Sequence, residues 1–323
     1  MKNLMFILLI INLGCTSSSD QQFINRFLAD NAQLLYTIKN NDIQVKLTII
    51  DRGENFIEYD YNIDTNKYFY PASTVKLPIA LFALEKLNEN KALSINTPFM
   101  LEDDTLKTTF KDELEKVFIL SNNQANNRFF EFTGQDYLNK KFTSKGFFNS
   151  TIFHRLSTTN SSKLEGKRVD FFTNDTIISF QNNNKEPKKL KLKNIKKGKG
   201  YINPTGDMIE QEMDFSKKNY ISITDLHRIM KILFFPEKFK EEERFNLTVE
   251  QREILFNYMS GYPKNFGYDP EEFPYYFNKF FIYGDKKLEL DENIKIYNKV
   301  GFAYGQLSDV AYIKKKNISI ILT

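Results

Sequence analysis

Ser73 and Lys76 have a spacing that can make a serine nucleophilic. They form an S-x-x-K motif at the start of a leucine-rich segment. Residues three apart share one face of a helix, so the Ser73 hydroxyl and the Lys76 amine are expected to be neighbours. Burial lowers the pKa of a lysine, and a neutral amine can take the proton of a hydroxyl beside it. The alternative is a serine that caps a helix, followed by an ordinary surface lysine.

Ser121 and Asn123 form an S-x-N motif directly before residues 124–132, which have helical spacing. The chemical interpretation places the Ser121 hydroxyl in a cleft, as a proton relay to a leaving group. The Asn123 amide would then hold either the substrate or Lys76. The alternative is that Ser121 is the N-cap of the helix that follows.

Lys299, Val300 and Gly301 form a K-x-G motif at the end of a predicted strand. Side chains alternate along a strand, so Lys299 and Gly301 share one face and Val300 lies on the other. Lys299 can therefore point from the sheet edge into a cleft, and Gly301 lets a substrate backbone lie against the strand. The alternative is an edge lysine that prevents strands from associating.

The order and setting of these motifs resemble those of the serine β-lactamase and penicillin-binding transpeptidase superfamily, whose motifs are S-x-x-K, S-D-N and K-T-G. The class A β-lactamase branch is the most similar. Residues 70–78 and 299–305 look like those of lipoprotein serine hydrolases of that branch. The resemblance covers nearly all of the mature chain, with a loose match over residues 160–290. It implies catalysis through an acyl-enzyme, with no cofactor and no metal.

The resemblance also implies a role for each motif residue. Ser73 is the expected nucleophile, Lys76 its base and Ser121 the relay. Lys299 would be the electrostatic anchor for Ser121 and for an anionic group of the substrate. The backbone N–H groups of Ser73 and Phe302 would form the oxyanion hole. The expected substrate-binding residues are Asn123, Val300, Gly301 and Phe302.

Three departures from the family concern β-lactam hydrolysis. Class A enzymes carry a loop Glu in the pattern R-x-E-x-x-x-N, and the stretch that begins at Arg155 has Ser157 in the Glu position. Glu165 or Asp170 could replace this base if the loop is re-routed, because a general base must lie within reach of its water. Val300 stands where a Thr binds the β-lactam carboxylate, and the Arg expected on the next strand is absent. Efficient β-lactam hydrolysis is therefore disfavoured.

The sequence thus predicts a serine hydrolase that acts through an acyl-enzyme on an amide or ester, either a small molecule or a peptide. We expect it to be a poor β-lactamase. The alternatives are a penicillin-binding or sensor lipoprotein without turnover, and a true class A-like β-lactamase. His154 and His227 could suggest a Ser-His-Asp triad, but we expect both to be structural.

The elements that must position these motifs follow from hydrophobic periodicity. The fold class is α/β (α+β), an antiparallel sheet built from both chain ends, flanked by helices, with an inserted helical subdomain. One domain is expected over 23–323, with a sheet part (23–70 and 291–323) and a helical part (71–290). Helices are predicted over 22–39, 77–87, 113–120, 124–132, 222–235 and 249–260, and strands over 43–49, 55–61, 294–300, 308–313 and 317–322.

Composition and charge exclude several kinds of metal site and of binding partner. The chain is 41% hydrophobic and 27% charged, as folded proteins are. Its one Cys and two His exclude structural zinc, an iron–sulfur cluster and a disulfide framework. Residues 185–199 carry eight Lys and one Glu, which accounts for the net charge of +4, so we expect no nucleic-acid partner. A solvated hairpin explains this lysine run, and attraction to phosphate groups of a cell envelope is the alternative. We expect a monomer.

The amino terminus reads as a secretory signal over residues 1–14, with Lys2 before a short apolar segment. This segment is too short to span a bilayer as a mature helix. Residues 12–15, Asn-Leu-Gly-Cys, resemble a bacterial lipobox, which implies that Cys15 is lipidated. The alternative is an ordinary signal peptide with an incidental Cys. We therefore expect a lipoprotein of the bacterial cell envelope, anchored at Cys15 through the linker 15–22 on the periplasmic or surface side.

Overall fold

The computed structural model describes residues 26, 30–51, 55–159, 161–203, 206–274, 276–283, 293–316 and 318–323. The signal segment and Cys15 lie outside these residues. So does Asn160, the last residue of the stretch 155–160 that corresponds to the loop of class A enzymes. Within the described ranges, every helix is too short or too polar to cross a bilayer.

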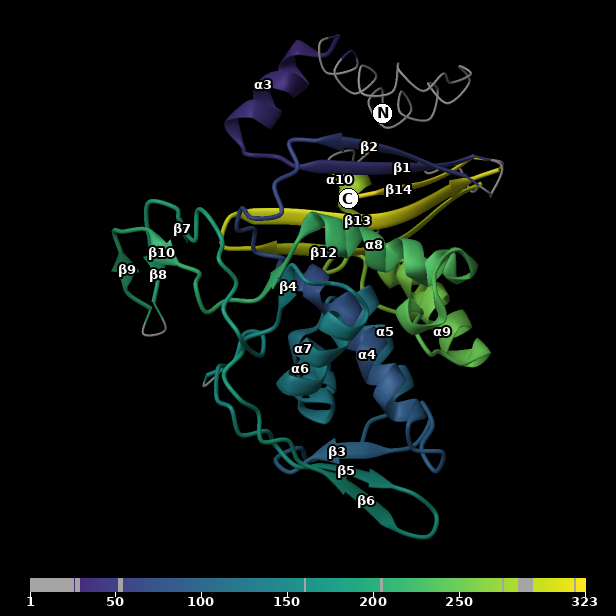
Figure 1. The fold of residues 1–323 in the computed structure, drawn as a ribbon. Coiled ribbons are helices and arrows are strands. Elements are labelled where there is room, and N and C mark those ends of the chain that lie inside the picture. Colours follow the sequence, from purple (N-terminus) through teal and green to yellow (C-terminus); the bar gives the residue numbers. More distant parts are fainter. Residues whose placement is uncertain are drawn as a thin grey trace.

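A five-stranded antiparallel sheet is built from both ends of the chain (Figure 1). Its strand order is β12-β13-β14-β1-β2, and Leu47 pairs with Leu322 where the two ends meet. The predicted fold class is therefore confirmed. The strands are β1 (Val45–Asp51), β2 (Asn55–Tyr61), β12 (Ile294–Ala303), β13 (Gln306–Lys315) and β14 (Ile318–Leu322).

Alternating side chains give this sheet two apolar faces. On the inner face, Val310 and Ile321 join the main core of the helical region. On the outer face, Ile313 packs in a second cluster with Ile282 of the short helix α10 (Phe280–Tyr283). The edge strand β12 is therefore held from both sides.

Helices α8 and α9 pack against the sheet, and the other central helices extend away from it (Figure 1). Several begin at a side-chain cap, as Thr248 of α9 shows by accepting from Gln251 N at 3.1 Å. The helices are α3 (Ala32–Asn40), α4 (Lys76–Asn88), α5 (Phe110–Ile119), α6 (Asn123–Thr133), α7 (Gln135–Ser144), α8 (Ile223–Phe234) and α9 (Val249–Ser260). The 3₁₀ turns are η2 (Ala72–Val75), η3 (Pro236–Lys238), η4 (Glu241–Glu243) and η5 (Pro263–Phe266).

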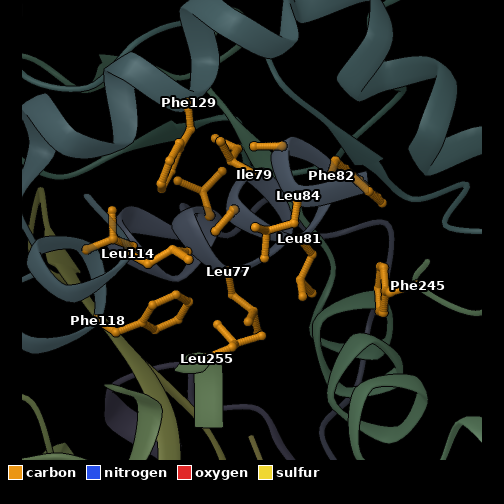
Figure 2. Packing of buried hydrophobic residues seen from close by; sticks show 14 of the residues in the cluster. Leu77, Ile79, Leu81, Phe82, Leu84, Leu114, Phe118, Phe129, Phe245 and Leu255 are labelled. Carbon is orange, nitrogen blue, oxygen red and sulfur yellow. The ribbon is translucent and has the colours of Figure 1, made fainter. Parts of the chain in front are cut away.

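Helix α4 is buried on all sides at the centre of the helical region (Figure 2). The sequence indicated a stripe of leucines such as Leu77 and Leu81, but Phe82 and Ala83 are buried just as fully. A helix that is apolar all round belongs in a core, and the sequence of α4 is apolar on nearly every face. Lys76, at the first position of this helix, therefore enters a dry interior.

Short strands complete the outer parts of the molecule. β3 (Phe99–Leu101), β5 (Val169–Phe172) and β6 (Ile177–Phe180) form a small sheet in the order β3-β5-β6. The remaining pairs are β4 (Ser150–Thr151) with β11 (Tyr220–Ile221), β7 (Lys196–Lys197) with β10 (Met213–Asp214), and β8 (Tyr201–Ile202) with β9 (Met208–Ile209).

The lysine run 185–199 does not fold into the predicted hairpin. Lys193 N donates to Asn66 O at 2.7 Å, and Tyr68 N donates to Lys193 O at 2.9 Å. Leu190 and Leu192 pack against an aromatic cluster that includes Tyr68, while the lysines at 189, 191 and 193 stay exposed. The run is extended along another part of the chain because its apolar partners lie there.

Candidate active site

Ser73 lies in the turn η2, which leads directly into α4, and its side chain is half-buried. The edge strand β12 approaches this turn very closely at Gly301. A Cβ on Gly301 would lie 2.6 Å from Pro71 O and 2.9 Å from Ser73 N. Such distances are shorter than van der Waals contact, so a glycine is required where the strand meets the turn. The predicted nucleophile therefore lies at the seam between η2 and β12.

Lys76 is 0% exposed, which excludes the alternative interpretation that it is an ordinary surface lysine. Its Nζ donates hydrogen bonds to the backbone O of Ser121 and, at 3.2 Å, to Ser121 Oγ. Burial and then the positive charge of Lys299 hold the pKa of Lys76 well below its usual value. The fold therefore favours the neutral amine, which is the form that accepts a proton.

Ser121 is not a helix cap. The N-cap of α6 is Asn122, whose side chain accepts from Ala125 N at 2.9 Å. Ser121 itself has a φ of 54°, an uncommon left-handed conformation for a residue with a side chain. Its Oγ lies 2.8 Å from Lys299 Nζ and 3.2 Å from Lys76 Nζ. The Ser121 hydroxyl therefore bridges two lysine amines.

Lys299 points from β12 toward the helical region and is 1% exposed, which excludes the exposed edge lysine. Besides Ser121, its Nζ contacts the backbone O of Val300 at 3.1 Å. Burial lowers the pKa of Lys299 to about 7, against an opposing attraction from Asp309. The three sequence motifs therefore meet at one point in space, with Ser121 between the two lysines.

Asn123, at the start of α6, contacts the loop that contains Ser157. Its Nδ2 donates to Ser157 Oγ at 2.9 Å, so the amide holds the loop rather than Lys76. Ser157 is exposed and has a φ of 47°. The loop is fixed by a buried ion pair, since Arg155 Nη2 lies 2.9 Å from Glu131 Oε2. The residue in the Glu position is therefore a serine hydroxyl on a well-anchored loop.

The two carboxylates considered as substitute bases are engaged elsewhere. Glu165 is fully exposed and pairs with Lys163 at 2.9 Å, which lowers the pKa of its carboxyl. Asp170 lies on β5, in the small sheet far from β12 (Figure 1), and accepts from Ser179 Oγ at 2.6 Å. In the described structure, the side-chain partners of these carboxylates are Lys163, Arg168 and Ser179, and Ser157 is not among them.

The predicted substrate-binding residues of β12 differ in placement. Val300 is buried on the outer face, opposite Asp309 in the strand register, so only its backbone borders the site. Phe302 is 67% exposed at the end of the strand. Gly301, between them, faces the turn that carries Ser73.

Both histidines are packed inside the fold. The His227 ring nitrogens lie 2.7 Å from Thr48 Oγ1 and 2.8 Å from Thr323 Oγ1, and burial lowers the pKa of His227 to about 3. His154 stacks on Tyr70, and burial lowers its pKa to about 4. In the described part of the chain, no group of three or more His, Cys, Asp or Glu could hold a metal ion.

A second polar cluster, missed by the sequence analysis, lies on the outer face of β12. Lys279 Nζ donates to Asn298 Oδ1 at 2.8 Å and to Met259 O at 2.9 Å. Asn298 Nδ2 donates to both carboxylate oxygens of Asp309, at 2.8 and 3.0 Å. Burial raises the pKa of Asp309 to about 6 and lowers that of Lys279 to about 7. Polar residues at positions 298 and 309, which the alternation assigns to a buried face, were the available signal.

Comparison with known proteins gives a family and a fold. The model of the beta-lactamase enzyme family matches residues 28–323. TLA-3 extended-spectrum β-lactamase is 14% identical, covers 95% of this chain and 90% of its own, and has a TM-score of 0.53. A class A β-lactamase from Bacteroides cellulosilyticus DSM 14838 is 12% identical, with coverages of 90% and 86% and a TM-score of 0.52. No curated protein matches the chain.

Proposed function

The chain belongs to the beta-lactamase enzyme family, and from this premise we propose that it is a serine hydrolase that forms an acyl-enzyme at Ser73. One observation supports the assignment above the others. The Ser121 hydroxyl lies between the amines of Lys76 and Lys299, both buried, beside the turn that carries Ser73. Buried lysines are costly to a fold, so two on one hydroxyl indicate a functional arrangement.

In the proposed first step, Lys76 takes the proton of the Ser73 hydroxyl, and Ser73 Oγ bonds to the carbonyl carbon of an amide or ester. The backbone N–H groups of Ser73 and Phe302 stabilise the oxyanion. When the tetrahedral intermediate collapses, Ser121 gives its proton to the leaving nitrogen or oxygen and regains one from Lys76. Lys299 remains protonated and stabilises the negative charge that develops around Ser121.

The second step distinguishes this protein from an efficient β-lactamase. Water must attack the acyl-enzyme, and this requires a base near the carbonyl. The residue in the corresponding loop position is Ser157, whose hydroxyl pairs with Asn123. We therefore propose slow hydrolysis of small esters, in which Lys76 serves again as base, and a long-lived adduct with any β-lactam that reacts.

Intact-mass analysis after exposure to a fluorophosphonate, an activated ester and a penicillin tests this proposal. We expect one covalent label, located on Ser73, with the fluorophosphonate. We expect slow release of the ester acyl group and a penicilloyl adduct that persists for minutes or longer.

A Ser73→Ala variant is the control, and equal labelling of this variant would overturn the assignment of the nucleophile. Rapid catalytic turnover of the penicillin would instead show that another group acts as the missing base. Persistence of every adduct, including the ester, would indicate a binding protein rather than a hydrolase.

We also propose that the enzyme is tethered to the cell envelope through a lipid on Cys15. The support is the lipobox-like sequence at residues 12–15 and the scarcity of other uses for a lone thiol in an exported chain. Wild-type protein is expected to partition with membranes. Cys15→Ser should release it or block its processing, and a soluble mature protein that begins near Ser17 in wild-type cells would contradict the proposal.

A further inference from the structure

Two buried lysines share one hydroxyl, and this contact by itself does not explain why Lys299 keeps a proton while Lys76 loses one. Lys76 Nζ and Lys299 Nζ lie 3.2 and 2.8 Å from the same Ser121 Oγ. Two positive charges at one dry site repel each other strongly, so the pair is expected to hold one proton fewer than two free lysines would. The proposed chemistry works only when the neutral amine belongs to Lys76 and the ammonium to Lys299. Something must therefore distinguish the two lysines.

The group that distinguishes Lys299 from Lys76 lies on the outer face of the sheet, at Asp309. Asp309 is on the neighbouring strand β13 and pairs in register with Val300, the residue that follows Lys299 in sequence. The side chain of Asp309 lies on the outer face of the sheet, and that of Lys299 lies on the inner face. Its negative charge acts on Lys299, whereas the charge that acts on Lys76 is that of Lys299. Lys279 is the other charged group that acts on Asp309: it attracts the carboxylate, and its own charge and that of Lys299 repel each other. The carboxylate is thus placed to favour a proton on one lysine of the pair only.

Hydrogen bonds to Asp309 oppose the effect of its burial, so its pKa rises only to about 6 and the carboxylate is ionised above that pH. Asn298 donates to both of its oxygens, and the backbone of Phe281 donates a further hydrogen bond. Lys279 orients the Asn298 amide by donating to Oδ1, and Asn278 O accepts from Nδ2 at 3.0 Å. Every donor and acceptor of the Asn298 side chain is therefore used, so the amide has one orientation.

We propose that Asp309, held by Asn298 and Lys279 on the back of β12, is a positioning residue that keeps the shared proton on Lys299 and leaves Lys76 free to act as the base. The inference rests on the proposed function, because it assigns a cause to the charge states that acylation of Ser73 requires. Asp309 touches neither the substrate nor the reacting atoms, and it acts through Lys299.

The test is the pH profile of Ser73 labelling by a fluorophosphonate, compared between the wild type and Asp309→Asn. Asparagine has the shape of aspartate and no charge, so Lys299 should lose its proton at lower pH. We expect the alkaline limb of the profile to move toward acid by about one pH unit. A rate that falls equally at every pH, with both limbs unmoved, would show a structural role and overturn the proposal.

Asp225→Asn is the matched control. Asp225 is another buried carboxylate, at the start of α8, and accepts from Ser150 Oγ at 2.7 Å. Its neutralisation should leave both limbs in place, and a shift equal to that of Asp309→Asn would overturn the specific role of Asp309. Failure of the wild type to label at Ser73 would instead contradict the proposed function.

A measurement on the wild type keeps the inference testable if Asp309→Asn does not fold. Nitrogen-15 labelling of lysine side chains allows NMR to distinguish an ammonium from a neutral amine. At a pH of about 6.5, below the usual range in which lysines lose a proton, we expect an ammonium at Lys299 and an amine at Lys76. Loss of the matching signal in Lys299→Met and Lys76→Met assigns the peaks, and the reverse assignment would overturn the proposal.

Discussion

The candidate site has two sides: the sheet side, with the buried amines of Lys76 and Lys299, and the loop side, with the exposed hydroxyl of Ser157. They differ in burial and in charge. On the sheet side, Lys76 and Lys299 are almost completely buried, and their amines contact the Ser121 hydroxyl. On the loop side, Ser157 is exposed and pairs with Asn123. Burying an amine costs free energy, whereas an exposed serine costs almost none. The difference indicates that the groups which form an acyl-enzyme are preorganised and that the loop supplies no base for its hydrolysis.

This contrast does not come from a loosely held loop. The Arg155–Glu131 ion pair is buried, and Arg155 Nη1 also donates to Lys163 O at 2.6 Å. Asn127 adds two hydrogen bonds to Leu156, at 2.8 Å each. The loop is therefore held by a buried ion pair and hydrogen bonds up to Leu156, and Ser157 after it carries a hydroxyl in place of a carboxylate.

Lys76→Met should have the largest effect, because it removes the base and keeps the apolar stem. We expect the rate of Ser73 labelling to fall at least about a thousandfold, since the serine then lacks a proton acceptor. The melting temperature should stay the same or rise, because a buried amine is replaced by a group that needs no partner. Intact-mass labelling and thermal unfolding measure the two quantities. Retained labelling with a large loss of stability would make Lys76 a structural residue.

Ser157→Glu should sharpen the contrast by adding the missing carboxylate. The Asn123 amide is already placed to hold it, and we expect the β-lactam adduct to decay about ten to a hundred times faster. The left-handed backbone at Ser157 strains serine and glutamate alike, so the substitution should change stability little. The lifetime of the adduct by mass spectrometry is the readout, with Ser157→Gln as the uncharged control. Equal lifetimes for Glu and Gln would show that a charge at this position cannot reach the water.

Local patterns predicted the frame of the molecule well. The bounds of β2 and α9 agree with the sequence analysis, because alternation and a Thr248 cap specify them locally. The inward face of Lys299 followed from the same alternation. The cap of α6 did not, since Ser121 and Asn122 are both good caps by residue type. Ser121 is assigned to the site by its contacts with Lys76 and Lys299, which are distant in sequence and so could not be predicted from the local pattern.

Non-local contacts explain what the sequence did not predict. Lys279 lies in a stretch without clear periodicity, and its partners on β12 and β13 follow it by 19 residues or more. No local pattern links such positions. The lysine run shows the same limit, because the alternation of Leu190 and Leu192 with lysines fits a hairpin as well as a segment laid against the Tyr68 cluster.

Lys279 and Lys299, the buried lysines on the two faces of β12, should make stability depend on pH. Burial lowers the pKa of Lys279 and Lys299 to about 7 in the fold, against about 10.4 in the unfolded chain. The unfolded state then binds up to two more protons, so stability should rise between about pH 7 and 10, by about 1.4 kcal/mol per pH unit for each of the two lysines. Urea unfolding across this range measures the slope, and Lys299→Met should reduce it. A flat profile would mean that these lysines remain charged in the fold.

Glu165→Gln should have the smallest effect, and it tests the loop side directly. Glu165 is the loop carboxylate nearest in sequence to Ser157, but it is fully exposed and bound to Lys163. A base must lie within hydrogen-bond reach of the attacking water, and a solvated ion pair at the surface is not so placed. The lifetimes of the ester and penicilloyl adducts should therefore equal those of the wild type. A Glu165→Gln enzyme whose adducts decay at least about ten times more slowly would show that the loop moves during turnover and brings this carboxylate to the acyl group.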